Sequence, residues 1–284
     1  MTRTVYVNGD YLPETDAKIS IFDRGFLMAD AVYEVTSVLD GKLIDFAGHM
    51  TRLHRSLSEL DMDAPVTDAE LEAIHRELIN RNDLTEGGIY LQVTRGAADR
   101  DFVFPENATP SLVLFTQAKP IIDAPAARTG IRVISIPDIR WGRRDIKTVQ
   151  LLAPSLGKMQ AKKAGCDDAW QIEDGYVTEG TSNNAYIVDE HGTLITRDLS
   201  NAILHGITRA AVLRYAREHQ VRVEERSFTI EEAKNAAEAF ITSASTFVMP
   251  VVEIDGTKIG AGEPGPTAKR LREIYIEESL KAAV

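Results

Sequence analysis

The stretch Arg143-Arg144-Asp145-Ile146-Lys147-Thr148-Val149-Gln150-Leu151-Leu152 decides how the whole chain is interpreted, and the question it raises is the role of Lys147. Taken alone, Lys147 is a lysine near three other charged residues. Such a residue is expected on the solvated surface, because lysines are mostly exposed. A chemical role for Lys147 therefore depends on what the other segments of the chain supply.

A second unusual segment is Val177–Ala185, which has the sequence VTEGTSNNA. Gly180, Ser182 and the two asparagines that follow favour a β-turn. A turn is also a good place to present an acidic side chain to a ligand. The segment therefore predicts a turn that displays Glu179.

Two later segments are suited to binding an anion. Ile203–Arg209, with the sequence ILHGITR, has a glycine that leads into a predicted helix, and helix N-terminal N–H groups bind phosphate well. An ordinary helix start with Thr208 as the cap would have the same sequence. Thr242–Thr246, with the sequence TSAST, is a hydroxyl-rich loop after a strand, which can wrap a phosphate or form a plain polar turn.

The composition excludes several classes of protein. A net charge of −11 argues against nucleic acid or an anionic membrane as the main partner, because both require clustered Lys and Arg. Cys166 is the only cysteine, so neither an intrachain disulfide nor a thiolate metal cluster can form. No run of 18 apolar residues occurs, and the first residues contain no apolar leader. We therefore expect a soluble cytoplasmic protein.

Hydrophobic periodicity and turn residues predict mixed secondary structure. Asn8-Gly9 indicates a hairpin turn, and Thr67 with Glu70 and Thr229 with Glu232 form capping-box patterns at two helix starts. We expect helices at 49–60, 67–81, 151–164, 207–219, 229–237 and 267–281, and strands at 5–7, 10–12, 31–39, 42–44, 88–94, 111–116, 131–136, 169–172, 185–188, 193–196 and 239–243.

Two prolines, Pro120 and Pro125, bracket a short segment where the composition changes. We predict a small N-terminal domain at 1–118, a linker at 119–125 and a larger C-terminal domain at 126–284. Because strands and helices are mixed in both parts, the expected class is α/β (α+β).

Other motifs carry no function. The run 260–265, GAGEPG, matches a dinucleotide-binding fingerprint only formally, because it follows a turn near the C-terminus and contains Pro264. The six histidines have no metal-ligand spacing, so no metal is expected.

Together and in this order, the four segments resemble the fold-type IV pyridoxal 5′-phosphate (PLP) enzymes, the family of D-amino acid and branched-chain aminotransferases. The resemblance runs from Tyr6–Gly9 to Pro264–Pro266. It rests on the joint presence of the D-I-K, T-E-G-T-S-N, G-I-T-R and M-P-V pieces. It implies a small N-terminal α/β domain and a larger C-terminal PLP-binding domain with a pseudo-barrel.

The resemblance implies that PLP is the cofactor and that Lys147 is the catalytic residue. Lys147 would form the Schiff base with PLP and then shuttle a proton, which suits a desolvated amine. Glu179 would pair with the pyridine nitrogen and keep it protonated, so that the ring stabilises a carbanion. Leu204 would pack against the ring.

For the phosphate, the resemblance implies Arg52, the N–H groups of Ile207 and Thr208, and the Thr208 hydroxyl. At the last phosphate position the family usually has Thr or Ser, whereas this chain has Ala244. The N–H of Ala244 is retained, and Ser243 or Ser245 is the alternative source of the hydroxyl. Losing one neutral hydrogen bond costs about 1 kcal/mol, so cofactor binding should survive.

Within the family, the chain is most similar to the D-amino acid aminotransferases. Tyr33 matches a tyrosine that helps hold the substrate carboxylate, and Leu152 stands where branched-chain enzymes typically carry a tyrosine. The loop from Arg95 resembles the carboxylate trap that a neighbouring subunit supplies, with Arg100 as its arginine. Phe102 replaces the trap's histidine, which removes a donor and could shift specificity toward bulkier or carboxylate-free amines.

The resulting hypothesis is transamination of D-amino acids by a homodimer, with D-alanine and 2-oxoglutarate giving pyruvate and D-glutamate by ping-pong kinetics. The partners are a small amino donor and a 2-oxo acid acceptor. The alternatives are an (R)-amine or branched-chain transaminase, an aminodeoxychorismate lyase, and a phosphate-binding module without turnover. A binding module would have no need of both Lys147 and Glu179.

Overall fold

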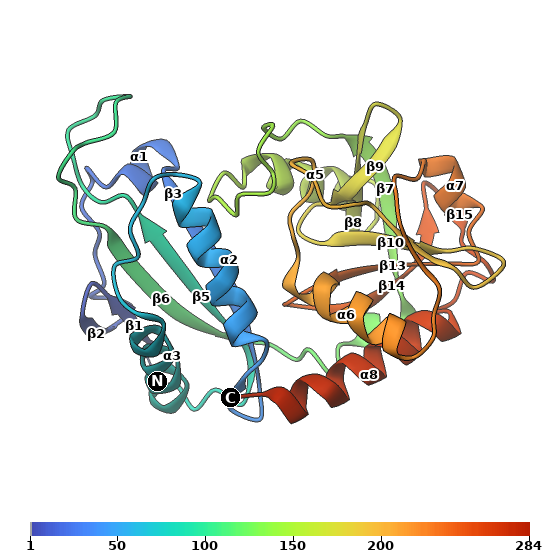
Figure 1. Cartoon of the computed structure of the whole chain (residues 1–284), viewed down its shortest axis with the longest axis horizontal. Coiled ribbons are helices and arrows are strands. Elements are labelled where there is room, and N and C mark those ends of the chain that lie inside the picture. Colours follow the sequence, from blue (N-terminus) through green and yellow to red (C-terminus); the bar gives the residue numbers. More distant parts are fainter. Residues whose placement is uncertain (1) are drawn as a thin grey trace. The chain divides into compact units, whose positions relative to one another are not determined.

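The computed structural model describes residues 2–284 (Figure 1). The chain forms two compact units. Unit 1 contains residues 2–120, Ile146–Gln150 and Ala282–Val284, and unit 2 contains Ile121–Asp145 and Leu151–Lys281. The sequence predicts two domains that are each one continuous stretch, 1–118 and 126–284. The units of the structure are not continuous, because the short segment that carries Lys147 packs with unit 1.

Unit 1 is built on a six-stranded antiparallel sheet in the order β2-β1-β6-β5-β3-β4. Asn8 and Gly9 both have positive φ values, 49° and 108°, which form the tight turn that the sequence predicts between the first two strands. The strands are β1 (Thr4–Val7), β2 (Asp10–Pro13), β3 (Ala31–Leu39), β4 (Lys42–Leu43), β5 (Glu86–Thr94) and β6 (Ser111–Ala118).

Helices α2 (Phe46–Ser58) and α3 (Asp68–Arg81) pack against this sheet, and a short helix α1 (Arg24–Met28) precedes β3 (Figure 1). The stripe of Met50, Leu53 and Leu57 is buried in the core of unit 1. Thr67 and Glu70 form the reciprocal capping box at the start of α3. The helical spacing in the sequence therefore identified the face that is buried.

Unit 2 contains a nine-stranded mixed sheet in the order β12-β11-β10-β13-β14-β7-β8-β9, with β15 paired to β14. Strand β9 also contacts β10, several places away in this order, so the sheet curls back on itself. The strands are β7 (Ile131–Pro137), β8 (Asp168–Glu173), β9 (Tyr176–Gly180), β10 (Asn184–Val188), β11 (Leu194–Thr196), β12 (Val223–Glu225), β13 (Glu238–Ser243), β14 (Phe247–Ile254) and β15 (Thr257–Lys258).

The helices of unit 2 are α4 (Pro125–Thr129), α5 (Leu152–Lys163), α6 (Ile207–Glu218), α7 (Ile230–Lys234) and α8 (Pro266–Ala282). The core lies between the sheet and these helices and contains Trp170, Phe228 and Met249. The mixed α/β class predicted from the sequence is confirmed.

Two local predictions were wrong. The helix expected at 229–237 ends at Lys234, and only half of its capping box forms, because the Glu232 carboxylate binds Arg226 instead of the cap backbone. Glu179, expected in a turn, lies on strand β9, and the bend begins only after Gly180. The ladder from Trp170 to Gly180 extends the strand beyond what its turn-forming residues suggested.

Within residues 2–284, no helix combines the length and apolarity that a membrane span requires. Over the same residues, no group of His, Cys, Asp and Glu side chains is arranged to hold a metal ion.

Candidate active site

Lys147 is held against the first strand residues of β3 in unit 1. Its carbonyl accepts a hydrogen bond from the Tyr33 N–H at 3.0 Å, and its own N–H donates to the Ser56 hydroxyl of α2 at 3.3 Å. Ile146, the preceding residue, is buried in the core of the unit. The Lys147 Nζ lies 3.9 Å from the centre of the Tyr33 ring. Lys147 is therefore a half-buried lysine with a fixed backbone, rather than a freely solvated one.

Arg52 lies on α2, one helical turn before Ser56, and is buried. Its Nε and one Nη donate to the two oxygens of Glu34, at 2.7 and 2.6 Å. His49 binds the same carboxylate at 2.7 Å. In the sequence, Arg52 lies off the apolar stripe of the helix. In the structure, it is buried in unit 1 and forms an ion pair with Glu34.

Tyr33, on β3, is the other predicted residue beside Lys147, and its ring stacks on Tyr90 of β5 at a centroid distance of 5.4 Å. Arg100 and Phe102 lie in an exposed loop, where the Arg100 guanidinium is 5.4 Å from the Phe102 ring. The side chain of Phe102 is 77% exposed. Arg24 fixes the loop by donating to the Asp101 carbonyl at 2.7 Å.

Glu179 is the centre of a buried cluster in unit 2. Its carboxylate accepts hydrogen bonds from the Leu204 N–H at 3.1 and 3.2 Å and from the Asn184 amide at 3.0 Å. The Arg140 guanidinium forms an ion pair with it. Burial raises the pKa of Glu179 above its ordinary value, and the positive charge of Arg140 opposes that rise.

Asn184 ties Glu179 to the segment that precedes α6. Its amide nitrogen also donates to the Leu204 carbonyl, at 2.9 Å. A Cβ on Gly206 would lie 2.1 Å from the Asn184 Oδ1, so a larger residue at this position would force the Asn184 side chain to move. The predicted ring contact, Leu204, and the N-terminus of α6 are therefore held in register with Glu179.

The predicted phosphate residues of unit 2 gather at one end of the curled sheet. Gly206 is the N-cap of α6, and no side chain caps that helix, so Thr208 lies inside its first turn and is not the cap. On the neighbouring strands, Asn184 pairs with Thr242, which places Ser243 and Ala244 directly after that pair. An uncapped helix N-terminus beside a hydroxyl-rich turn is a suitable site for a phosphate dianion.

Glu179 is a buried carboxylate whose close partners all donate to it. The Arg140 guanidinium, the Leu204 N–H and the Asn184 amide donate to its two oxygens. An ionised carboxylate held in this way can accept a further hydrogen bond from a protonated ring nitrogen. The residues present therefore fit the ring of PLP.

Of the predicted residues, the structure brings together Lys147, Tyr33 and Arg52 in unit 1 and Glu179, Leu204, Ile207, Thr208, Ser243 and Ala244 in unit 2. Sequence reasoning missed Glu34, Arg140 and Asn184, which hold these side chains. Glu34 follows Tyr33 on β3, and an acidic residue within an otherwise buried strand was the available signal.

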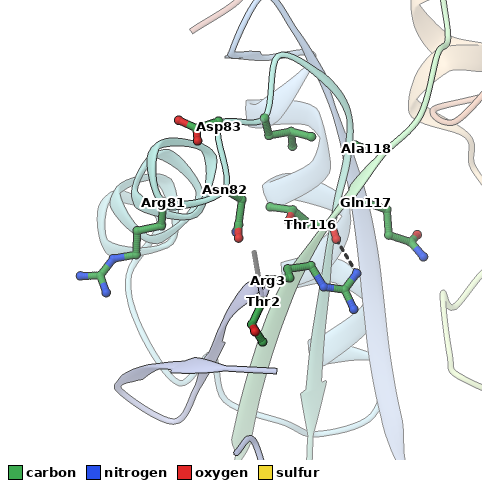
Figure 2. A pocket seen from close by; sticks show the side chains of 9 residues that line it. Thr2, Arg3, Arg81, Asn82, Asp83, Thr116, Gln117 and Ala118 are labelled. Carbon is green, nitrogen blue, oxygen red and sulfur yellow. Dashed lines mark hydrogen bonds between the residues drawn. The ribbon is translucent and has the colours of Figure 1, made fainter. Parts of the chain in front are cut away.

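A separate surface pocket in unit 1 is lined by Thr2, Arg3, Arg81, Asn82, Asp83, Leu84, Thr116, Gln117 and Ala118 (Figure 2). Arg3 donates there to the Thr116 carbonyl at 2.8 Å, and the side chain of Arg81 points away (Figure 2). None of the predicted site residues lines this pocket.

Comparison with known proteins agrees with these observations. The family described as Amino-transferase class IV matches residues 31–254. The D-alanine aminotransferase of Staphylococcus haemolyticus is 38% identical over 283 residues, which cover 98% of this chain and 99% of that protein. The D-alanine aminotransferase of Bacillus licheniformis is 38% identical over 270 residues, 94% of each chain.

Among solved structures, the T.th. branched-chain amino acid aminotransferase with pyridoxamine 5′-phosphate has a TM-score of 0.89 and 28% sequence identity, covering 98% of this chain and 94% of that one. The fold class predicted from the sequence is confirmed by this likeness. The protein is therefore a member of the class IV aminotransferases, the fold-type IV family that its four segments resemble.

Proposed function

We propose that this aminotransferase transfers the amino group of D-amino acids to 2-oxo acids, with D-alanine and 2-oxoglutarate giving pyruvate and D-glutamate. The observation that carries the proposal is the buried Glu179 carboxylate with its fixed donors, in a chain whose relatives are D-alanine aminotransferases. PLP, when bound, supplies an aldehyde that receives the amino group and a protonated ring that withdraws electrons.

Each side chain of the site has a separate role in this proposal. We assign to Lys147 the covalent attachment of the cofactor through its Nζ and the transfer of the proton at the substrate Cα. Glu179 holds the proton on the ring nitrogen, and Leu204 packs against the ring. The phosphate is bound by Arg52, the N–H groups of Ile207, Thr208 and Ala244, and the hydroxyl groups of Thr208 and Ser243. We propose that Tyr33 and Arg100 hold the substrate carboxylate.

We further propose that the chain works in the cytoplasm as a homodimer, with residues 1–118 as a small domain, 119–125 as a linker and 126–284 as the larger PLP-binding domain. The exposed loop that carries Arg100 supports the dimer, because its apolar side chains need a covering surface and its arginine would then serve the partner's substrate.

The test is a half-reaction. PLP-loaded protein is mixed with one amino donor at a time, and the absorbance of the cofactor is followed. D-Alanine is expected to convert the cofactor from its aldehyde-derived to its amine form, whereas L-valine and L-leucine leave it unchanged. Lys147→Ala should abolish the conversion, and Lys163→Ala, an exposed lysine on α5, should not.

A branched-chain substrate is the second candidate, favoured by the likeness to the branched-chain enzyme solved with pyridoxamine 5′-phosphate. Conversion by L-valine and L-leucine but not by D-alanine would select that candidate and exclude the D-specific one. An (R)-amine belongs in the same panel because Phe102 replaces a polar trap residue. A steady-state pattern of parallel double-reciprocal lines is expected for ping-pong transfer.

A further inference from the structure

The Glu179 cluster contains a side chain to which the proposed function gives no role. Arg140 lies in the loop after β7 and is almost fully buried. One Nη forms the ion pair with Glu179 Oε1. Its Nε and other Nη donate to the two oxygens of Asp138, at 3.0 and 2.7 Å. Arg140 therefore bridges two buried carboxylates.

Asp138 is in turn fixed within unit 2. The Thr178 hydroxyl donates to it at 2.7 Å, and Thr178 is the strand neighbour of Glu179. The backbone N–H of Arg140 also donates to Asp138, at 3.1 Å. Although burial works in the opposite direction, the hydrogen bonds and charge of Arg140 lower the pKa of Asp138. Asp138 is therefore a permanent anion that anchors the guanidinium.

The other donors to Glu179 are neutral. The Leu204 N–H and the Asn184 amide set the orientation of the carboxylate, but they carry no net charge. The remaining charged groups nearby are Arg144, which is paired with Glu173 at 2.6 Å, and Asp138, which repels Glu179. Arg140 is thus the cation that contacts Glu179 directly, and it offsets the cost of burying that carboxylate.

We propose that Arg140 is a positioning residue for the transaminase: anchored by Asp138, it keeps Glu179 charged and aimed at the site of the cofactor ring. This inference rests on the proposed function only in assigning Glu179 to the cofactor ring. The physical arrangement belongs to the cofactor-free chain and can be tested there. A protonated Glu179 could not hold a second proton on a ring nitrogen, so the charge state is what Arg140 controls.

Removing the cation and keeping it should have different effects. Arg140→Met removes the attractive charge, so Glu179 should titrate at a higher pH than in the native chain. Asp138→Asn removes the anchor of the guanidinium and also a charge that repels Glu179, so these two effects oppose each other and the change should be smaller than in Arg140→Met. General loosening of the fold would instead shift the Glu179 titration in Arg140→Lys as far as in Arg140→Met. Arg140→Lys, which keeps the charge but loses the planar fork, should restore most of the native titration.

The measurement is carbon-13 NMR of the cofactor-free protein labelled at the glutamate carboxyl carbons, with the Glu179 signal identified by its loss in Glu179→Gln. Arg226→Met is the matched control, because it removes an arginine of unit 2 whose ion pairs with Glu224 and Glu232 are half exposed. It should leave the Glu179 titration unchanged. In the loaded enzyme, nitrogen-15 NMR of labelled cofactor should show loss of the ring proton in Arg140→Met.

An unchanged Glu179 titration in Arg140→Met, or an equal upward shift in Arg140→Lys, overturns the inference. If Arg140→Met does not fold, Arg140→Gln, which is polar but uncharged, takes its place and should give the same upward shift. The outcome is independent of the proposed function, because a protein that transaminates no substrate would still show the shift in Arg140→Met and its recovery in Arg140→Lys. Conversely, a working transaminase without that shift would exclude only the role of Arg140.

Discussion

At the scale of single residues, the ion pair of Glu34 with Arg52 has a consequence for stability. Glu34 is fully buried, and burial by itself raises the pKa of a carboxyl group. The charge and hydrogen bonds of Arg52, with the hydrogen bond of His49, outweigh this and lower the pKa of Glu34 to about 2, from 4.5 without these partners. A carboxyl group whose pKa is lower in the folded state stabilises the fold above its unfolded pKa, and this stabilisation is lost as the pH falls.

We therefore expect the contribution of Glu34 to the free energy of unfolding to be complete at neutral pH and to decline from about pH 4.5 toward pH 2, by about 3 kcal/mol in total. Glu34→Gln should cost about 3–5 kcal/mol at neutral pH because it leaves Arg52 buried without its charge partner. Urea unfolding of the native chain and of Glu34→Gln over a pH series measures both the pH dependence and the cost of the substitution. Glu14→Gln, which breaks an exposed pair with Arg3, is the control. A gap between native and Glu34→Gln that does not narrow in acid would refute the assignment.

Phe102 gives a second prediction at this scale. Because its side chain is 77% exposed, Phe102→His should leave the free energy of unfolding nearly unchanged. The imidazole adds a hydrogen-bond donor beside Arg100, so the KM for D-alanine should fall several-fold while kcat changes little. Steady-state kinetics with D-alanine and with an (R)-amine provide the comparison. An equal change for both donors would show that the added group does not contact the carboxylate.

At the scale of elements, the N-terminus of α6 depends on a close approach between backbone and side chain. Gly206 has an ordinary φ of −64°, so its requirement for glycine comes from packing against Asn184 and not from backbone conformation. Asn184 in turn holds both Glu179 and the Leu204 carbonyl. Within unit 2, Asn184 therefore couples the position of the α6 N-terminus to that of the Glu179 carboxylate.

Gly206→Ala should accordingly displace Asn184 and weaken the binding of PLP about five- to thirty-fold, because one or two hydrogen bonds of about 1 kcal/mol each are lost. Isothermal titration of the cofactor-free protein with PLP measures the affinity. Gly142→Ala is the matched control, since a Cβ there would meet no atom within 4 Å. Native affinity in Gly206→Ala would mean that Asn184 can shift without disturbing the site.

At the scale of the whole molecule, the exposed apolar side chains of unit 1 bear on assembly. Phe26 and Val103 are each 73% exposed. Their segments lie together, because the Ala98 N–H donates to the Phe22 carbonyl and Arg24 binds the Asp101 carbonyl. Contiguous apolar surface of this kind usually marks a protein interface. A second copy of the chain is the partner that the proposed dimer supplies.

Sedimentation of the native protein should therefore give twice the chain mass of 31.3 kDa. The double variant Phe26→Asp, Val103→Asp should sediment as a monomer, because a dimer would bury four added charges, two on each subunit. Leu199→Asp, a charge added at an exposed position of unit 2, should leave the dimer intact. A double variant that remains dimeric would place the interface elsewhere.

Patterns along the chain were enough to establish the class of the fold and the family. Hydrophobic spacing and turn residues are local signals, so the hairpin at Asn8-Gly9, the capped start of α3 and most of the helices and strands follow from neighbours along the chain. The segments around Lys147 and Glu179 likewise identified the family, because their residue types occur together and in order.

The side chains that hold those residues in place became known only from the folded chain. The partners of Arg52 and Glu179 are Glu34 and Arg140, which lie 18 and 39 residues away in sequence. A local pattern can mark one member of such a pair, as the acidic residue within β3 does, but it does not identify the distant residue that pairs with it. Burial makes them specific: a charge removed from water must find its counter-charge inside the fold, and strand register determines which one it meets. The segment of Lys147 also joins unit 1 through contacts that are distant in sequence, because its carbonyl pairs with Tyr33 and Ile146 enters the core.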